Sequence, residues 1–132
     1  ARTVTADWVR GKAILLVEDE AEVASALARL LALDGHRVTT ARDGLVALQK
    51  LGEREYDLIL SDIKMPGLDG LGFYRELERS HPRLARRIAF VTGDADPQET
   101  QAFLEASGVP YAVKPLTLVE IRRVVQQVLA GA

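Results

Sequence analysis

Short apolar runs alternate with helical patterns along most of this chain. Three runs are almost continuously apolar and end at a polar or acidic residue, which is typical of strands buried on both faces of a parallel sheet. Two further segments combine β-branched or aromatic side chains with polar ones and also predict strands. The five expected strands are Ala13–Val17, His36–Ala41, Leu58–Asp62, Arg87–Thr92 and Tyr111–Val113.

The intervals between and after these strands carry helix signals. Apolar residues recur at helical spacing from Val23 to Leu31 and again from Ile121 to Leu129. Acidic N-caps are expected at Asp43 and Asp96, and Thr117–Glu120 forms a capping box. Another helix is expected up to about residue 79, weakened by two internal glycines. Five strands alternating with five helices through short loops predict right-handed crossovers and a single doubly wound α/β domain, its parallel sheet covered on both faces.

Polar side chains follow the carboxyl ends of the predicted strands, where ligands bind in folds of this class. They are Glu18, Asp19 and Glu20 after the first strand, Asp62 at the third, Thr92, Gly93 and Asp94 at the fourth, and Lys114 after the fifth. A parallel sheet brings these strand ends to one edge, although the residues are distant in sequence. We therefore expect several carboxylates, one hydroxyl and one ammonium to share a small area.

Such a carboxylate cluster restricts the chemistry of the site. Two carboxylates about 4 Å apart repel by about 4 kcal/mol at an effective dielectric constant near 20. A cluster of Glu18, Asp19 and Asp62 therefore needs a cation or shared protons, and Mg²⁺ with water suits such a site. A phosphoryl group would supply further oxygen ligands to the ion, and Lys114 and the Thr92 hydroxyl can bind its other oxygens. Asp62 lies centrally, so it is the best candidate for a nucleophile that forms an acyl phosphate.

Each of these features alone has a simpler explanation. Acidic residues at the start of a helix interact favourably with its dipole, which explains Glu20 and Glu22 better than a ligand role. A lone Asp at a strand end is commonly a cap or turn former. The joint placement at four strand ends carries the functional hypothesis. Arginines at 83, 86, 87, 122 and 123 form no single stripe and are expected to be solvated surface.

Composition limits the remaining classes of protein. A length of 132 residues favours one domain, and a net charge of −2 argues against a main role in binding nucleic acid or anionic lipid. The absence of Cys excludes disulfides, thiolate zinc sites and cysteine nucleophiles. The apolar runs are far shorter than the roughly 20 residues of a membrane span. Met65 is the only Met, so we expect a segment of a longer protein, with a linker at 1–11 and the domain at 12–132.

Four segments of the chain resemble the receiver domains of two-component response regulators. They are residues 15–20 (LLVEDE), 60–70 (LSDIKMPGLDG), 91–94 (VTGD) and 113–115 (VKP). The resemblance covers Lys12 to about Ala130, and the spacing between the segments fits throughout. It implies a five-stranded sheet of order 2-1-3-4-5, like that of the chemotaxis regulators.

The resemblance also implies roles for individual residues. Asp62 would be the phosphoacceptor. Mg²⁺ would be bound directly by Asp19 and Asp62, through water by Glu18, and by the backbone carbonyl of Lys64. The phosphoryl donor would be a histidine on a histidine kinase or a histidine phosphotransfer protein. The domain would catalyse its own phosphorylation and, slowly, its own dephosphorylation.

Further roles concern the switch and its lifetime. Thr92 and Lys114 would hold the phosphoryl oxygens, and Tyr111 would be the aromatic switch residue whose ring turns inward as the Thr92 hydroxyl moves. Lys64 and Asp94 occupy the variable positions that tune hydrolysis in this family. We hypothesise that they pair across the pocket and lengthen the phosphorylated lifetime, with two solvated side chains that do not touch as the alternative.

The parent protein and its partners are expected from weaker signals. Residues 102–111 look like those of receivers at the C-terminus of hybrid histidine kinases, so we expect a hybrid kinase as the parent protein. A free-standing regulator is the second alternative, and a longer transcriptional regulator is the third. Small residues at 21, 24, 25 and 28 are expected to accept a phosphodonor helix. We also expect a homodimer through the last helices, and neither nucleic-acid binding nor membrane contact by this domain. The expected location is cytoplasmic, with tethering to a membrane-bound sensor kinase.

Three other classes of protein share some of these features. A phosphatase of the haloacid dehalogenase type expects a second Asp two residues after the nucleophile, where this chain has Lys64. A flavodoxin-like nucleotide binder needs a phosphate loop after the first strand, where the Glu18–Glu20 acids would repel phosphate. A non-phosphorylated interaction domain of the same fold remains as the alternative.

Overall fold

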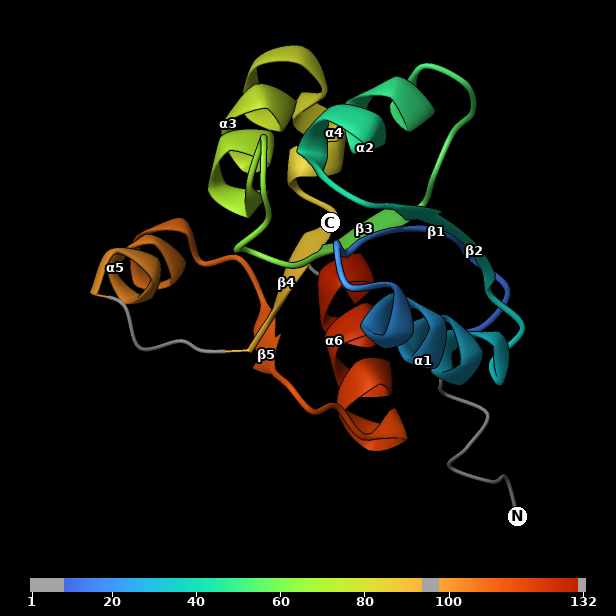
Figure 1. The fold of residues 1–132 in the computed structure, drawn as a ribbon. Helices are drawn as coiled ribbons and strands as arrows, with labels where there is room; N and C mark the ends of the chain where they lie inside the picture. The colour runs from blue at the N-terminus through green and yellow to red at the C-terminus, as the bar shows by residue number, and fades with distance from the viewer. Residues whose placement is uncertain (1–8, 94–97, 131–132) are drawn as a thin grey trace.

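The computed structural model describes residues 9–93 and 98–130, which form a five-stranded sheet with helices on both faces (Figure 1). The strands are β1 (Ala13–Val17), β2 (Arg37–Ala41), β3 (Leu58–Ser61), β4 (Ile88–Thr92) and β5 (Tyr111–Val113). The helices are α1 (Ala21–Ala32), α2 (Gly44–Leu51), α3 (Gly70–Ser80), α4 (Pro82–Ala85), α5 (Gln98–Ser107) and α6 (Leu118–Ala130). All strand pairs are parallel and the order is β2-β1-β3-β4-β5. The predicted fold class and strand order are confirmed.

Alternating side chains of the strands divide the core into two layers. In β1, Ile14 and Leu16 belong to the cluster that includes apolar residues of α1 and α6. Leu15 and Val17 belong to the cluster that includes residues of α2 and α3. Figure 1 shows α1 and α6 on one side of the sheet and α2, α3 and α4 on the other. Both faces of the central strands are covered, which explains why their sequences are continuously apolar.

The structure differs from the sequence prediction in the number of helices and in some boundaries. Five helices were expected, whereas the described residues contain six, because α4 forms a separate turn of four residues. Pro82 occupies the first position of this turn, where its missing N–H costs nothing. The strands β2, β3 and β4 are each one residue shorter than expected, because they exclude His36, Asp62 and Arg87 respectively. The N-cap expected at Asp96 lies outside the described residues.

The start of α3 lies directly against the segment that follows β3. The Asp69 side chain caps the helix by accepting from the Gly72 N–H at 2.9 Å. The Gly70 N–H donates to the Ile63 carbonyl at 2.7 Å, and a Cβ atom on Gly70 would lie only 2.3 Å from the Asp62 carbonyl oxygen. Glycine at position 70 therefore allows this close approach, which holds the segment carrying Asp62 in place.

Candidate functional site

Four strands bring polar side chains to one edge of the sheet. Glu18 follows β1, Asp62 follows β3, Thr92 is the last residue of β4 and Lys114 follows β5. Carboxylate oxygens of Glu18, Asp19 and Asp62 all lie within 4.8 Å of one another. The structure thus brings together four strand ends that are separated by up to 96 residues in sequence.

Backbone hydrogen bonds fix the position of Asp62 at the centre of this cluster. Its N–H donates to the Val17 carbonyl at 2.8 Å, and its carbonyl accepts from the Ser61 hydroxyl at 2.8 Å. The Asp62 Oδ1 atom accepts from the Ile63 N–H at 2.7 Å. With only 8 % of its surface exposed, Asp62 is a buried carboxylate held from several sides. The second carboxylate oxygen, Oδ2, is directed to Lys114.

Lys114 bridges two of the carboxylates. Its Nζ atom donates to Glu18 Oε1 at 2.7 Å and to Asp62 Oδ2 at 3.2 Å. Burial raises the pKa of Glu18 above its ordinary value and the Asp62 charge adds to this, whereas the Lys114 bond opposes it. Burial disfavours the charged form of Lys114, but the bond to Glu18 and the charges of both acids together raise its pKa. The ammonium is therefore held in its charged form beside the two carboxylates.

The acidic cluster has the composition of a site for a hard divalent cation. All the side-chain atoms that could bind a cation in this cluster are carboxylate oxygens, the ligand type that Mg²⁺ prefers. Glu18 and Asp62 are buried, whereas Asp19 is exposed, so solvent can complete a coordination shell. Lys114, the ammonium bonded to the cluster, cannot by itself neutralise three carboxylates. The residues present therefore fit Mg²⁺.

Only some of the other predicted site residues lie beside the acidic cluster. Thr92 and Lys64 line a hollow of about 220 Å³ together with Asp19, Asp62 and Lys114. By contrast, the structure does not bring Tyr111 into this hollow. Its exposed fraction is 37 %, and it lines a separate groove along β5 and α6. Asp94 lies outside the described residues, so the expected Lys64–Asp94 pair stays a prediction.

An apolar groove that the sequence analysis missed lies beside the acidic cluster. It has a volume of about 300 Å³ and runs between α1 and the segment before α6. Its apolar lining consists of Val23, Ala26, Leu27, Leu30, Pro115 and Leu116. The small-residue surface expected on α1 is partly wrong, because Ala24 is buried in the core against the sheet and Ala28 is half-buried. Periodicity had assigned Val23 and Leu30 to the core, and their partial exposure could not be read from spacing.

Arg122 also departs from the expectation of a solvated arginine. Its Nε and Nη2 atoms donate to the two carboxylate oxygens of Asp34, each at 2.9 Å. Asp34 is almost completely buried, with 3 % exposure. The two residues are 88 positions apart, so no local pattern indicated the pair.

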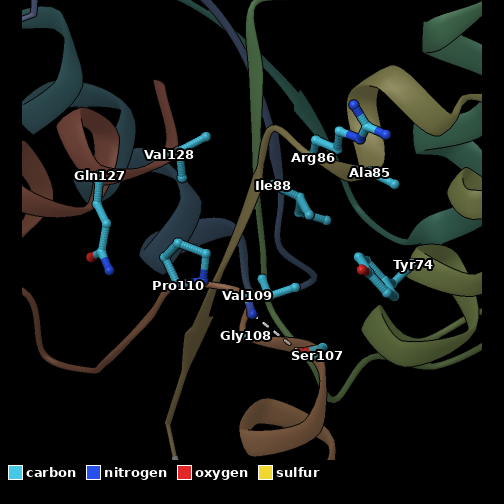
Figure 2. A pocket seen from close by; sticks show the side chains of 10 residues that line it. All are labelled: Tyr74, Ala85, Arg86, Ile88, Ser107, Gly108, Val109, Pro110, Gln127 and Val128. Carbon is cyan, nitrogen blue, oxygen red and sulfur yellow. Dashed lines mark hydrogen bonds between the residues drawn. The ribbon is translucent and has the colours of Figure 1, made fainter. Parts of the chain in front are cut away.

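A second hollow lies away from the acidic cluster. It has a volume of about 370 Å³ and is lined by residues of α3, α4, β4, the α5–β5 turn and α6. Figure 2 shows Tyr74 and Gln127 on opposite sides of it, with Ile88 and Val109 between them. None of the described residues that line it carries a carboxylate. No described helix combines the length and apolar character required to cross a bilayer.

Comparison with known proteins identifies the family. The sequence model of the response regulator receiver domain matches residues 14–126, which is most of the chain. The chain therefore belongs to the response regulator receiver domain family.

Individual relatives agree with this assignment. The chain is 36 % identical over 120 residues to the response regulator GacA of Pseudomonas viridiflava, covering 89 % of this chain and 55 % of the relative. It is 33 % identical over 113 residues to the transcriptional regulatory protein TcrA of Mycobacterium tuberculosis, covering 86 % and 44 %. The chain thus spans about half the length of these curated relatives.

Solved structures with the same fold include receiver domains of histidine kinases. One is from Syntrophus aciditrophicus, with a TM-score of 0.79, 31 % identity and coverage of 92 % of both chains. Another, from a sensor histidine kinase of Pseudomonas aeruginosa, has a TM-score of 0.78, 32 % identity and coverage of 91 % and 98 %. That structure has a magnesium ion coordinated in its active site cleft.

Proposed function

We propose that this chain accepts a phosphoryl group from a phosphohistidine onto Asp62, in a reaction that requires Mg²⁺. The observation that carries the proposal is the setting of the Asp62 carboxylate. Oδ1 is held by the Ile63 N–H at 2.7 Å, Oδ2 lies 3.2 Å from the Lys114 ammonium, and oxygens of Glu18 and Asp19 lie within 4.8 Å. A nucleophile, a cation site and a phosphate-binding ammonium are thus adjacent.

The proposed step exchanges one bond to phosphorus for another. A carboxylate oxygen of Asp62 attacks the phosphorus atom and forms the P–O bond of an acyl phosphate. The P–N bond to the donor histidine breaks and its electron pair returns to the ring, which is protonated on its other nitrogen and therefore leaves as neutral imidazole. We assign the attack to Oδ2, because its contact with Lys114 can be exchanged for one between Lys114 and a phosphoryl oxygen, whereas Oδ1 stays bound to the backbone N–H of Ile63.

Neighbouring side chains would stabilise the charge that moves in this step. Asp19 and Asp62 would hold Mg²⁺ directly, Glu18 through water, and the Lys64 carbonyl would complete the protein ligands. The bound ion would neutralise the carboxylates and the transferring oxygens. Lys114 would then exchange its contact with Asp62 for a phosphoryl oxygen, and the Thr92 hydroxyl would donate to another. Tyr111 would turn inward afterwards, changing the surface that a downstream partner contacts.

The groove on α1 is the proposed docking site for the histidine donor. Lys114 lines both the groove and the acidic hollow, so an occupant of the groove lies next to the acceptor. The groove has an apolar floor, and Glu22 lies at its margin. An amphipathic helix that carries the phosphohistidine of a histidine kinase or phosphotransfer protein fits this chemistry.

Intact-mass analysis with a small phosphodonor tests the proposed function. The purified chain is incubated with Mg²⁺ and phosphoramidate, a small compound with the P–N bond of phosphohistidine. We expect the mass to rise by one phosphoryl group in the wild type and in Glu53→Gln, an exposed acid elsewhere in the chain. We expect no rise in Asp62→Asn or when Mg²⁺ is chelated. A modified Asp62→Asn protein would contradict the proposal and favour a different acceptor.

Lys64 is proposed to lengthen the phosphorylated lifetime, because it lines the acidic hollow at a position where it can restrict the approach of water. The substitution Lys64→Ala is expected to accelerate decay of the acyl phosphate several-fold, as followed by loss of the added mass. Arg42→Ala, which removes an exposed cation outside the hollow, is the matched control and should leave the decay rate unchanged. An unchanged or slower decay in Lys64→Ala would refute the proposed role.

The parent protein and the self-association of the domain are further proposals. We infer a cytoplasmic receiver of a hybrid histidine kinase, supported by the two kinase receivers that match almost the whole chain. The two curated relatives, a response regulator and a transcriptional regulatory protein, are each about twice as long as the matched region and favour a regulator with an output region as the second candidate. Tyr111, Val113 and Val119 are exposed near β5 and α6 and support the proposed homodimer. Sedimentation at increasing concentration, with and without phosphodonor, would detect it.

A further inference from the structure

Two ion pairs hold the ends of α1 against segments near the C-terminus of the chain. Before the helix, Glu18 bonds Lys114 at 2.7 Å. After the helix, Asp34 bonds Arg122 of α6 through both carboxylate oxygens at 2.9 Å. The apolar groove lies on the same helix, between its residues 22–30 and residues 114–116. The relative position of the two groove walls therefore depends on these pairs and on the core beneath them.

The two pairs differ in their relation to the chemistry. The Lys114 pair belongs to the acidic cluster, and in the proposed reaction Lys114 transfers its bond to a phosphoryl oxygen. The Asp34–Arg122 pair takes no part in that exchange, because neither residue lines the acidic hollow. Together with the apolar core shared by α1 and α6, it can therefore hold the end of α1 against α6 while the other pair rearranges.

The geometry of the Asp34–Arg122 pair suits a fixed spacer. A guanidinium bound to both oxygens of a carboxylate sets orientation as well as distance. Asp34 is further held through its carbonyl, which accepts from the Gly11 N–H at 3.1 Å. Arg122 also lowers the pKa of Asp34, which keeps the carboxylate ionised. Removing the guanidinium alone would leave a buried carboxylate unpaired, and the end of α1 would have to move to let water reach it.

We propose that the Asp34–Arg122 pair is a positioning clamp for the phosphodonor, which holds α1 and the segment before α6 at the separation that a donor helix requires. This inference rests on the proposed function and names a determinant of partner binding that lies outside the acceptor site. The clamp acts on docking only. A donor too small to use the groove should not depend on it.

The test compares a small donor with a protein donor. Phosphoramidate is the small donor, and the protein donor is a phosphorylated histidine phosphotransfer domain, selected beforehand as one that phosphorylates the wild-type chain. The test variant is Arg122→Gln. The matched control is Arg123→Gln, which removes the same charge from the next residue of α6, an exposed arginine bonded only to Gln127 among the described residues.

We expect Arg122→Gln to raise the KM for the protein donor about tenfold, with little change in kcat and with the phosphoramidate rate within about twofold of wild type. Arg123→Gln should leave both donors unaffected. Equal behaviour of the two variants toward the protein donor would overturn the clamp. A parallel loss with both donors would also overturn it, because the pair would then serve only the fold.

A second variant protects the test against misfolding of the first. The double substitution Asp34→Asn with Arg122→Met removes both charges and leaves no buried ion unpaired, so it should fold more readily. It should show the same selective rise in KM, and a wild-type KM would contradict the clamp. Failure of the wild type to react with phosphoramidate would count against the proposed function itself, so the two failures can be distinguished.

Discussion

At the scale of single residues, the acceptor site depends on the balance between the Lys114 ammonium and the three clustered carboxylates. Lys114 contacts Glu18 and Asp62, while Asp19 is exposed at the margin of the cluster. This leaves net negative charge in a largely buried region, which a divalent cation would compensate. The cluster is therefore most directly examined through its affinity for Mg²⁺.

Replacing Asp19 by Asn should weaken Mg²⁺ binding by at least about tenfold, since loss of even an indirect supporting group commonly has that effect. Isothermal titration with MgCl₂ measures the affinity. Glu20→Gln is the matched control, because Glu20 lines the same hollow but is not one of the three clustered carboxylates. Equal loss of affinity in both variants would show a general effect of negative charge rather than a ligand role for Asp19.

A second residue-scale prediction concerns pH. His36 is buried, and its Nδ1 atom accepts from the Lys12 N–H at 3.0 Å. Burial is the main cause that holds the pKa of His36 below its ordinary value of 6.5; Asp34 opposes this, while Lys12 and Arg10 add to it. The unfolded chain therefore takes up this proton at higher pH than the folded chain. The stability that neutral His36 contributes is present above pH 6.5 and is lost as pH falls toward the folded pKa.

Urea unfolding between pH 7.5 and about 5.5 measures this loss, with a slope of at most about 1.4 kcal/mol per pH unit for one group. The slope should become shallower in His36→Asn. It should persist in His81→Gln, which removes the only other histidine of the chain. An identical slope in His36→Asn and wild type would contradict the assignment.

At the scale of elements, local signals predicted those helices whose ends are built from short-range contacts. Asp43 caps α2 by accepting from the Val46 N–H at 2.9 Å, and the Thr117–Glu120 capping box forms at the start of α6 as expected. The helix α4 was missed because four residues are too few to show a hydrophobic period. Local patterning thus identified the longer helices, in which apolar residues recur over several turns.

The close approach at Gly70 gives an element-scale prediction. In Gly70→Ala the new Cβ would meet the backbone of Asp62 and Ile63 at 2.3 and 2.8 Å, so α3 or the acceptor segment must shift. We expect a loss of about 2–3 kcal/mol in the free energy of unfolding and slower phosphorylation. Gly72→Ala is the control, because there the nearest atom is the end of the Leu68 side chain, which can rotate. Its cost should stay below about 1 kcal/mol, and equal costs in urea unfolding would contradict the interpretation.

At the scale of the whole molecule, the parallel sheet explains how residues distant in sequence share one site. The sequence predicted that Glu18, Asp62, Thr92 and Lys114 follow strand ends, and the order β2-β1-β3-β4-β5 places those ends together. The groove and the Asp34–Arg122 pair were not predicted, because each depends on how α1 lies against α6. Periodicity gives the apolar face of each helix, but which residues of the two helices meet is set by packing across the core.

Identification of the phosphorylated residue tests the central claim most directly. After reaction with phosphoramidate and Mg²⁺, borohydride reduces an acyl phosphate of aspartate to homoserine, and peptide mass spectrometry locates the reduced residue. We predict homoserine at Asp62 and at no other aspartate. Reduction at Asp19, or a phosphorylated protein with Asp62 unchanged, would contradict the account.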